Sequence, residues 1–137
     1  MLRREAVRRT LILVIASQNP FPEFVDTWRI REVGDFPLDE IDQLGKAIIQ
    51  FDLNGFGVLR FRRVKAEVDC RYVERGRAHF VDFTWFGAND QGMAAGRGWA
   101  CVLQTGGLMG HLFVHRGQDW PFMAARIKNL SRRRPLN

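Results

Sequence analysis

The fold is decided by the segment Ala66–Trp85, which reads AEVDCRYVERGRAHFVDFTW. Apolar and polar residues alternate on both sides of Arg75-Gly76, and a period of two is typical of a strand with one buried face. Glycine tolerates the positive φ of a short hairpin turn. Opposed residues of a hairpin point to the same side of the sheet, so one side here is apolar. That side is expected to hold Ala66, Val68, Cys70, Tyr72, His79, Val81, Phe83 and Trp85.

Two later turns extend this pattern. Gly106-Gly107 is among the strongest two-residue turn signals, and Gly117-Gln118 marks another turn. With these turns we expect Trp99 opposite Val114, and Val114 opposite Pro121. The three hairpins then share one apolar inner face, which predicts a continuous antiparallel sheet.

The first half of the chain predicts a strand over Val25–Val33 and then one amphipathic helix over residues 38–51. The helix would begin after Pro37 and end before Asn54-Gly55. We therefore expect an α+β domain, with this helix packed on a curved antiparallel sheet of about six to seven strands, as a half-barrel or cone. A closed lipocalin-like β-barrel is the alternative. The apolar face of the helix would consist of Leu38, Ile41, Leu44, Ile48 and Phe51.

The chain of 137 residues, 46% of them hydrophobic, suits a single domain. We place it at residues 23–130, between a basic and apolar leader with its linker (1–22) and a basic tail (131–137). Of 21 Lys and Arg and 15 Asp and Glu, eight basic residues and one acidic residue lie near the two ends, so 13 basic and 14 acidic residues remain. Nucleic-acid modules carry their positive charge on the folded core, so we expect no nucleic-acid binding by this core.

Two cysteines, Cys70 and Cys101, are too few for a disulfide framework, and we expect both as small buried residues on the apolar face. Residues 1–17 place a basic region before an apolar run, as a secretory signal does. The run is far too short to span a bilayer. We expect a cytoplasmic protein without a membrane partner, and secretion is the alternative.

Three aromatic residues of the predicted inner face, Tyr72, Trp85 and Trp99, are the candidate ligand-binding residues. A curved sheet wrapped on a helix leaves space between the two layers for a small apolar or aromatic molecule. The packing of a hydrophobic core explains the same three residues, so both interpretations stay open.

The predicted outer face of the later strands is aromatic, with Phe113 opposite Phe122 and His115 opposite Trp120. A small monomer rarely leaves such a patch bare. These four residues are therefore the candidate interface of a homodimer. A ligand, the far wall of a closed barrel or the N-terminal segment are the alternative covers.

Asp82 and His111 are the candidates for acid–base chemistry without a metal or cofactor. Asp82 is predicted opposite Asp69, and two desolvated carboxylates at that distance would share a proton. Neutralisation by Arg71 or Lys65 is the alternative. His111 and His115 are expected roughly 13 Å apart along one strand, too far apart to bind one metal ion. No phosphate-binding or nucleophile motif occurs, so we expect no cofactor.

Two stretches resemble known groups of proteins. The run FTWFG at 83–87 with GRGWA at 96–100 and GHLFVHRG at 110–117 resembles small bacterial proteins without assigned activity. The ending RRRPLN at 132–137 resembles the C-terminal tails of proteins encoded in mobile integron gene cassettes. This resemblance implies a bacterial accessory protein of the mobile metagenome whose basic tail records the DNA element. It implies no activity and no site.

The function that these patterns favour is a small binding protein. It would take an apolar or aromatic ligand in a sheet–helix pocket, a second copy of itself on the aromatic face, or both. The first alternative is a metal-independent acid–base enzyme using Asp82 or His111. The second is an accessory module that binds another protein.

Overall fold

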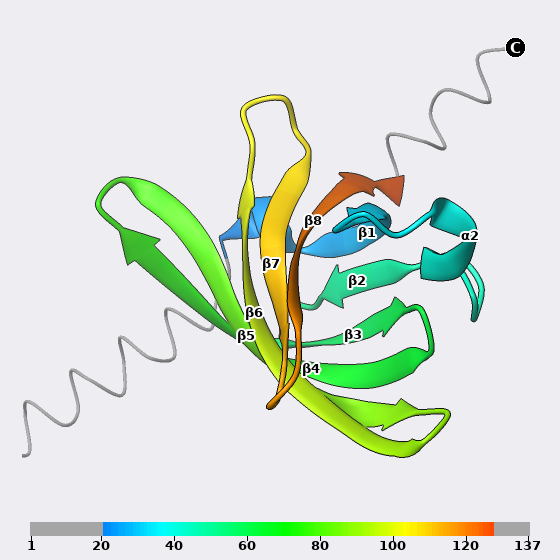
Figure 1. Ribbon diagram of the computed structural model, residues 1–137. Coiled ribbons are helices and arrows are strands. Elements are labelled where there is room, and N and C mark those ends of the chain that lie inside the picture. The colour runs from blue at the N-terminus through cyan, green and yellow to red at the C-terminus, as the bar shows by residue number, and fades with distance from the viewer. Residues whose placement is uncertain (1–20, 128–137) are drawn as a thin grey trace, which may run out of the picture.

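The computed structural model describes residues 21–127, which form a closed barrel of eight antiparallel strands joined in chain order (Figure 1). β1 pairs with both β2 and β8, and this pairing closes the sheet. The elements are η1 (Pro22–Phe24), β1 (Asp26–Val33), α2 (Leu38–Ile41), β2 (Ile48–Phe51), β3 (Phe56–Phe61), β4 (Val64–Arg75), β5 (Ala78–Asn89), β6 (Gly92–Val102), β7 (Leu108–Val114) and β8 (Asp119–Arg126).

The closure corrects the predicted α+β half-barrel or cone, because residues 21–127 form almost entirely β-structure and contain no helix inside the sheet. The alternative prediction, a closed barrel, agrees with the structure in that the sheet is closed. Within residues 21–127 no helix is long and apolar enough to cross a bilayer. The predicted basic tail and nearly all of the predicted leader lie outside the described residues.

The predicted helix over 38–51 is wrong. Only Leu38–Ile41 is helical, and Ile48–Phe51 is β2. The apolar residues of this segment fit both periods: helical spacing selects Ile48 and Phe51, whereas a period of two selects Ala47, Ile49 and Phe51. The structure follows the second pattern, since those three are at most 1% exposed and Leu38 is 45% exposed. Closing the barrel requires a strand here to pair β1 with β3.

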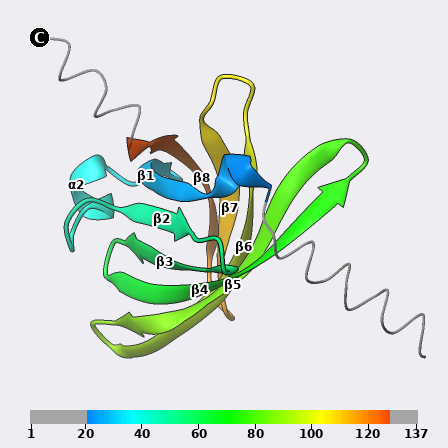
Figure 2. The ribbon, with the colours of Figure 1, turned by 180° about the vertical axis from the view of Figure 1, so that it is seen from behind.

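The 3-10 helix η1 closes one end of the barrel. Phe24 is fully buried there, with its ring 6.4 Å from that of Phe51 and 5.9 Å from that of Tyr72. The indole Nε1 of Trp28 donates a hydrogen bond of 3.0 Å to the Phe24 carbonyl, which ties η1 to β1. Beside this end, the β4–β5 hairpin extends past its neighbours as an arm (Figure 2). The last residues of β4 and the first of β5 pair only with each other within the sheet.

In the β4–β5 hairpin the predicted faces are confirmed, but the partners differ. Cys70 pairs with Phe83 and not with Val81, and Arg75 pairs with Ala78, so the turn is Gly76-Arg77. A shift of two positions leaves every side chain on its predicted face. It does separate Asp69 from Asp82, because Asp69 lies opposite Thr84.

In the β6–β7 and β7–β8 hairpins the registers differ from the predicted ones by an odd number of positions, which moves residues to the other face. Trp99 pairs with His111, and both lie outside the barrel, while Gly98 and Ala100 face inward. Cys101 shares the outer face with Trp99. In β8 the inward residues are Trp120, Phe122 and Ala124, which pair with Leu112, Gly110 and Leu108.

Glycines on the inner face explain this register. A Cβ on Gly96 would lie 2.5 Å from the Trp85 ring, and one on Gly110 would lie 2.7 Å from the Phe122 ring. A Cβ on Gly98 would overlap the ring of Phe83. The large rings of β5 and β8 therefore fill the space that the missing side chains of β6 and β7 leave. The apolar side chains of Trp99 and Cys101 favour these two residues as inner residues. The space left beside the rings is too small for them and selects the glycines instead.

We predict that Gly98→Ala lowers the free energy of unfolding by about 1–3 kcal/mol, the usual cost of overpacking a core. Urea unfolding followed by circular dichroism measures this change. Gly107→Ala is the matched control, because its Cβ would meet nothing nearer than the Ala124 carbonyl at 3.6 Å. Equal unfolding midpoints for the two variants would contradict the proposed glycine–ring packing.

Candidate functional site

The barrel end opposite η1 is hollowed by a cavity of about 370 Å³, here called the cup. It lies where α2, the β3–β4 turn and the tip of the β5–β6 hairpin come to one side of the barrel (Figure 1). Its walls are apolar side chains of the barrel interior, namely Phe61, Val64, Trp85, Ala94, Val114 and Trp120. Its rim is polar and consists of Glu40, Gln43, Arg62, Arg63, Asn89, Asp90 and Gln91.

Three aromatic rings from three different strands define the cup. Phe61 lies between the other two, with its ring centre 6.3 Å from that of Trp85 and 6.2 Å from that of Trp120. Both contacts are edge-to-face, at interplanar angles of 89° and 69°. This geometry is favourable for aromatic pairs and holds the rings in fixed positions. The cup therefore presents a rigid aromatic surface.

Two N–H groups of the cup residues have no acceptor. The indole Nε1 of Trp85 and the Nε of Arg62 are both buried, and neither has a hydrogen-bond partner among residues 21–127. A buried donor without a partner costs about 1–3 kcal/mol, and such groups are rare in folded proteins. The cup residues thus carry hydrogen-bonding capacity that the described chain does not use.

Arg62 has a strained backbone. Its φ is +51°, in the left-handed region that favours glycine, and it follows Phe61 in the tight turn between β3 and β4. Its backbone N–H donates to the Ile41 carbonyl at 2.7 Å. Its guanidinium lies 4.0 Å from the ring centre of Phe36 and pairs with Glu40 at 3.2 Å. A left-handed non-glycine residue costs about 1–2 kcal/mol.

The other charged groups of the rim are paired. Arg63 donates to the Asp90 carboxylate at 2.6 Å and to the Gln43 side chain at 2.8 Å. These contacts connect the β3–β4 turn to the β5–β6 hairpin and to the loop that follows α2. The rim is therefore held together by side-chain bonds across three separate segments.

A partly buried ion pair anchors the α2 segment to the barrel. Arg29 of β1 donates to both carboxylate oxygens of Asp42, at 2.7 and 2.5 Å, and the Ala47 backbone N–H donates to the same carboxylate at 2.9 Å. The hydrogen bonds from Arg29 hold the pKa of Asp42 below its ordinary value, although burial acts in the opposite direction. This pair fixes the segment that supplies Glu40 and Gln43 to the rim.

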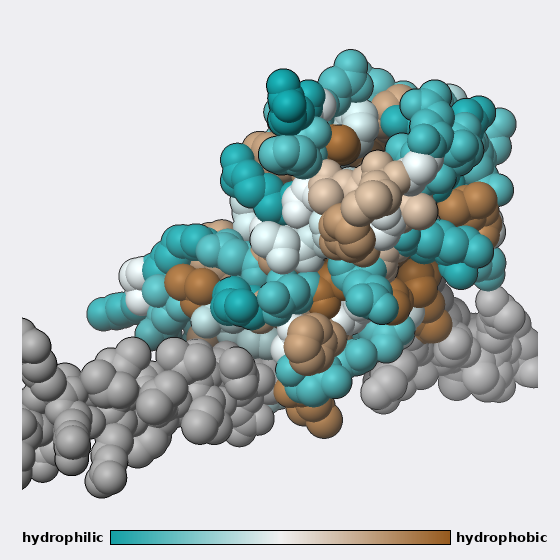
Figure 3. Space-filling model, turned by 90° about the horizontal axis from the view of Figure 1, so that it is seen from below, coloured by the Kyte–Doolittle hydropathy of each residue, from teal (hydrophilic) through white to brown (hydrophobic). Residues whose placement is uncertain are grey.

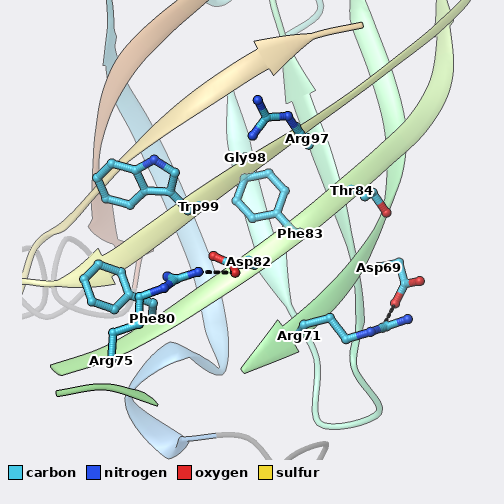
Figure 4. A pocket seen from close by; sticks show the side chains of 10 residues that line it. All are labelled: Asp69, Arg71, Arg75, Phe80, Asp82, Phe83, Thr84, Arg97, Gly98 and Trp99. Carbon is cyan, nitrogen blue, oxygen red and sulfur yellow. Dashed lines mark hydrogen bonds and ion pairs between the residues drawn. The ribbon is translucent and has the colours of Figure 1, made fainter. Parts of the chain in front are cut away.

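A second hollow, of about 520 Å³, lies on the outer face of β4, β5 and β6 (Figure 4). Its two carboxylates are occupied, since Arg71 pairs with Asp69 and Arg75 pairs with Asp82, each at 2.5 Å. Arg97 takes part in no ion pair among residues 21–127, and its guanidinium lies 4.2 Å from the Phe113 ring centre. We call this hollow the outer groove.

The two candidate catalytic residues both lie on this outer face. Asp82 and His111 pair with Trp99 from opposite sides, so the three form one row across β5, β6 and β7. The Nε2 of His111 lies 2.6 Å from the Asp119 carboxylate. Asp82 does not lie opposite Asp69, contrary to the prediction, because the register of the β4–β5 hairpin differs by two positions. Its carboxylate pairs with Arg75. The alternative is met for Asp69, which pairs with Arg71, whereas the partner of Asp82 is Arg75, which the alternative did not name.

The three candidate ligand residues are not brought together. Trp85 lines the cup, Tyr72 packs against Phe24 at the closed end, and Trp99 lines the outer groove. Burial raises the pKa of Tyr72, and burial raises the pKa of the neighbouring Cys70 thiol to about 12. Both groups are therefore neutral at physiological pH, as expected for core residues.

The four candidate interface residues are also divided between the two faces. Phe113 and His115 line a hollow on the outside, whereas Phe122 is 1% exposed in the core and Trp120 lines the cup. Viewed from below, the apolar side chains form separate areas between hydrophilic ones (Figure 3). The patch that favoured a homodimer is thus not a single surface.

The important residues that sequence reasoning missed are Phe61, Arg62 and the inward position of Trp120. The segment Arg60–Lys65 alternates like a continuous strand, yet it contains the β3–β4 turn. No Gly, Asn or Asp stands at this turn, so the usual turn signal is missing. The alternating stretch around this turn is longer than one strand of a small barrel. That length was the available indication that the stretch contains a turn.

No protein-family model, curated protein or solved structure matches the chain. The resemblance to small bacterial proteins and to integron cassette products therefore stays a prediction. Across residues 21–127, no group of three His, Cys, Asp or Glu side chains is placed to hold a metal ion.

We predict that Asp42→Asn lowers the free energy of unfolding by about 1.5–3 kcal/mol at pH 7, the range for hydrogen bonds to charged groups. A carboxylate whose pKa is lowered by folding stabilises the protein above the unfolded-state pKa of about 3.9 and loses that contribution as the pH falls through the folded value. The difference between wild type and variant should therefore shrink from pH 6 to pH 3 in urea unfolding.

Asp39→Asn is the control for this prediction, because Asp39 is an exposed carboxylate of the same segment with no ion pair among the described residues. We expect a change of less than about 0.5 kcal/mol for that variant, as for most surface substitutions. A constant difference between Asp42→Asn and wild type across this pH range would contradict the role of the ion pair.

Proposed function

We propose that this protein binds a small aromatic or apolar molecule in the cup. The observation that carries this proposal is the set of three fixed rings, Phe61, Trp85 and Trp120, around a cavity open at one end of the barrel. Small-molecule sites occupy about 300–1,000 Å³, are mostly apolar and are common at barrel mouths. A volume of about 370 Å³ suits a small molecule of two or three aromatic rings.

The architecture supports this proposal in a second way. The barrel interior below the cup is filled by side chains, and η1 closes the far end, so a ligand would enter only from the rim. The walls are already in place, because their rings are held by packing and the rim by ion pairs. A preformed site loses little conformational entropy on binding.

The outer groove is less suited to an apolar ligand. It lies on the outside of the sheet, and charged side chains make up half of its lining, namely Asp69, Arg71, Arg75, Asp82 and Arg97. Two ion pairs would have to be desolvated beneath any apolar molecule bound there, which opposes binding.

The proposal is tested with N-phenylnaphthylamine, an uncharged dye whose emission rises in apolar sites. We expect saturable binding to the wild type and a loss of affinity of about tenfold or more in Ala94→Leu, because each methylene added to or removed from an apolar pocket changes binding by about 1–3 kcal/mol. Ala94 lines the cup and is half-buried.

Ala88→Leu is the matched control, since Ala88 is exposed on the neighbouring strand β5 and lines no cup. It should bind the dye as the wild type does. Circular dichroism would confirm that both variants fold. Equal affinity of the two variants, or no saturable binding by the wild type, would contradict the proposal.

A second candidate function is proton abstraction at the outer face, and the contact of 2.6 Å between His111 and Asp119 favours it. A carboxylate on Nε2 orients the ring and leaves Nδ1 for a substrate. Nitrobenzisoxazole, whose ring opens on proton removal alone, is a suitable probe. We expect opening faster than in buffer, and the excess should be lost in both His111→Gln and Asp119→Asn. The same rate in wild type and His111→Gln would exclude this function.

A further inference from the structure

We propose that the outer face of β6 and β7 binds the phosphate group of a small phosphate monoester, and that Arg97 and Arg116 hold its oxygens. The site is a hollow of about 420 Å³, here called the basic hollow. Its polar side chains are those of Thr84, Arg97, His115 and Arg116, and Phe113 forms part of its wall. None of these five residues lines the cup, so the inference goes beyond the proposed function and does not rest on it.

The first argument is the charge of the basic hollow. Within residues 21–127, neither Arg97 nor Arg116 takes part in an ion pair, and no Asp or Glu lines the hollow. The cup and the outer groove differ in this respect, because carboxylates stand among the arginines that line them. Two unpaired guanidinium groups in one concave surface attract an anion.

The carboxylates at neighbouring positions of the outer face do not oppose this attraction, because each has a partner of its own. Asp69 binds Arg71, Asp82 binds Arg75, and Asp119 contacts His111. Figure 4 shows the first two of these pairs and shows Arg97 apart from both. Among the described residues of this face, Arg97 and Arg116 are therefore the arginines left for an external anion.

The second argument is that the structure positions Arg97. Its backbone pairs with Thr84 of β5 on one side and with Phe113 of β7 on the other, so it stands in the middle of the outer face. Its guanidinium lies 4.2 Å from the ring centre of Phe113. This cation–π contact holds the cation over the ring and leaves its N–H groups at the ring plane's edge available for oxygen atoms.

The third argument is the backbone of Arg116, which reaches the basic hollow from the β7–β8 turn. Its φ is +58°, a conformation that glycine adopts without strain. The turn is held by two hydrogen bonds of 2.9 Å, one from the Val114 N–H to the Gln118 carbonyl and one from the Gly117 N–H to the Val114 carbonyl. Strained residues of this kind cluster at ligand sites, where the side chain has a role.

The charge and the donors of the basic hollow favour a phosphate monoester over a carboxylate. A monoester carries a charge of about −1.5 to −2 at pH 7 and three strong acceptor oxygens, which matches two guanidinium groups. The Thr84 hydroxyl is a further donor in the lining. A carboxylate carries a single charge and two oxygens, so it satisfies fewer of these donors. A volume of about 420 Å³ leaves room for the esterified part of a small molecule.

Three probes with the same three-carbon skeleton test the inference: glycerol 1-phosphate, glycerate and glycerol. None has a ring, so none resembles the molecule proposed for the cup. Binding is followed at low ionic strength in ¹H–¹⁵N spectra, through the backbone signals of Gly96 and Gly117, which line the basic hollow. We expect saturable shifts with glycerol 1-phosphate, an affinity about tenfold or more above that of glycerate, and no saturation with glycerol.

Arg97→Gln and Arg116→Gly should each lower the affinity for glycerol 1-phosphate by about tenfold or more, because each removes one charge-assisted contact. Both positions are exposed, and glycine suits the backbone of residue 116, so both variants should fold. Arg77→Gln is the matched control. It removes the same charge from an exposed arginine at the tip of the β4–β5 hairpin, which lines neither the basic hollow nor the outer groove. Its affinity should stay within about twofold of the wild type.

The inference is overturned if glycerol 1-phosphate gives no saturable shifts, or if glycerate binds as tightly. It is also overturned if Arg77→Gln loses as much affinity as Arg97→Gln, since general attraction to a positive charge would then explain the binding. A blocked tripeptide centred on phosphoserine tests the source of the phosphate. Binding of this peptide about tenfold or more tightly than glycerol 1-phosphate would replace the small molecule by a phosphorylated protein. No outcome bears on the cup, because the probes lack the ring that the cup would bind.

Discussion

The packing of aromatic rings into the spaces above inner-face glycines is the constraint on which the rest of the barrel depends. Gly96, Gly98 and Gly110 admit the rings of Trp85, Phe83 and Phe122, and a side chain at any of them would meet a ring or a backbone oxygen. Because a ring on one strand fills the space that a glycine leaves on a neighbouring strand, these contacts set the registers of β6, β7 and β8. Those registers in turn decide which side chains reach the cup and which face outward.

The two ends of the barrel differ because different segments cover them. At one end η1 inserts Phe24 against Phe51 and Tyr72, so that end is filled. At the other end the covering segment is α2 with its loop, which is held to the wall by Arg29 and Asp42 and leaves the cup beside it. The same sheet therefore makes a packed core and, above it, a cup with aromatic walls and a polar rim.

The sequence predicted the antiparallel strands and the faces of β4 and β5, because an error of two positions in register preserves the alternation. It did not predict the faces of β6 and β8. There Trp99 would bury far more apolar surface than Gly98, and only the ring of Phe83 on a neighbouring strand makes the glycine necessary. Such information is non-local, and so is the barrel closure that makes residues 48–51 a strand. Of the three rings that line the cup, the sequence analysis named only Trp85 as a candidate ligand-binding residue.

The arm formed by the β4–β5 hairpin has a consequence for association between molecules. Among residues 21–127, β4 pairs with β3 only as far as Asp69, and β5 pairs with β6 only from Val81 onward. Free strand edges are templates for aggregation, and natural proteins protect them with charge. Glu74, Arg75 and Arg77 stand exposed at this tip. An incoming strand would have to bury three ionised groups, so the charged tip opposes edge-to-edge polymerisation.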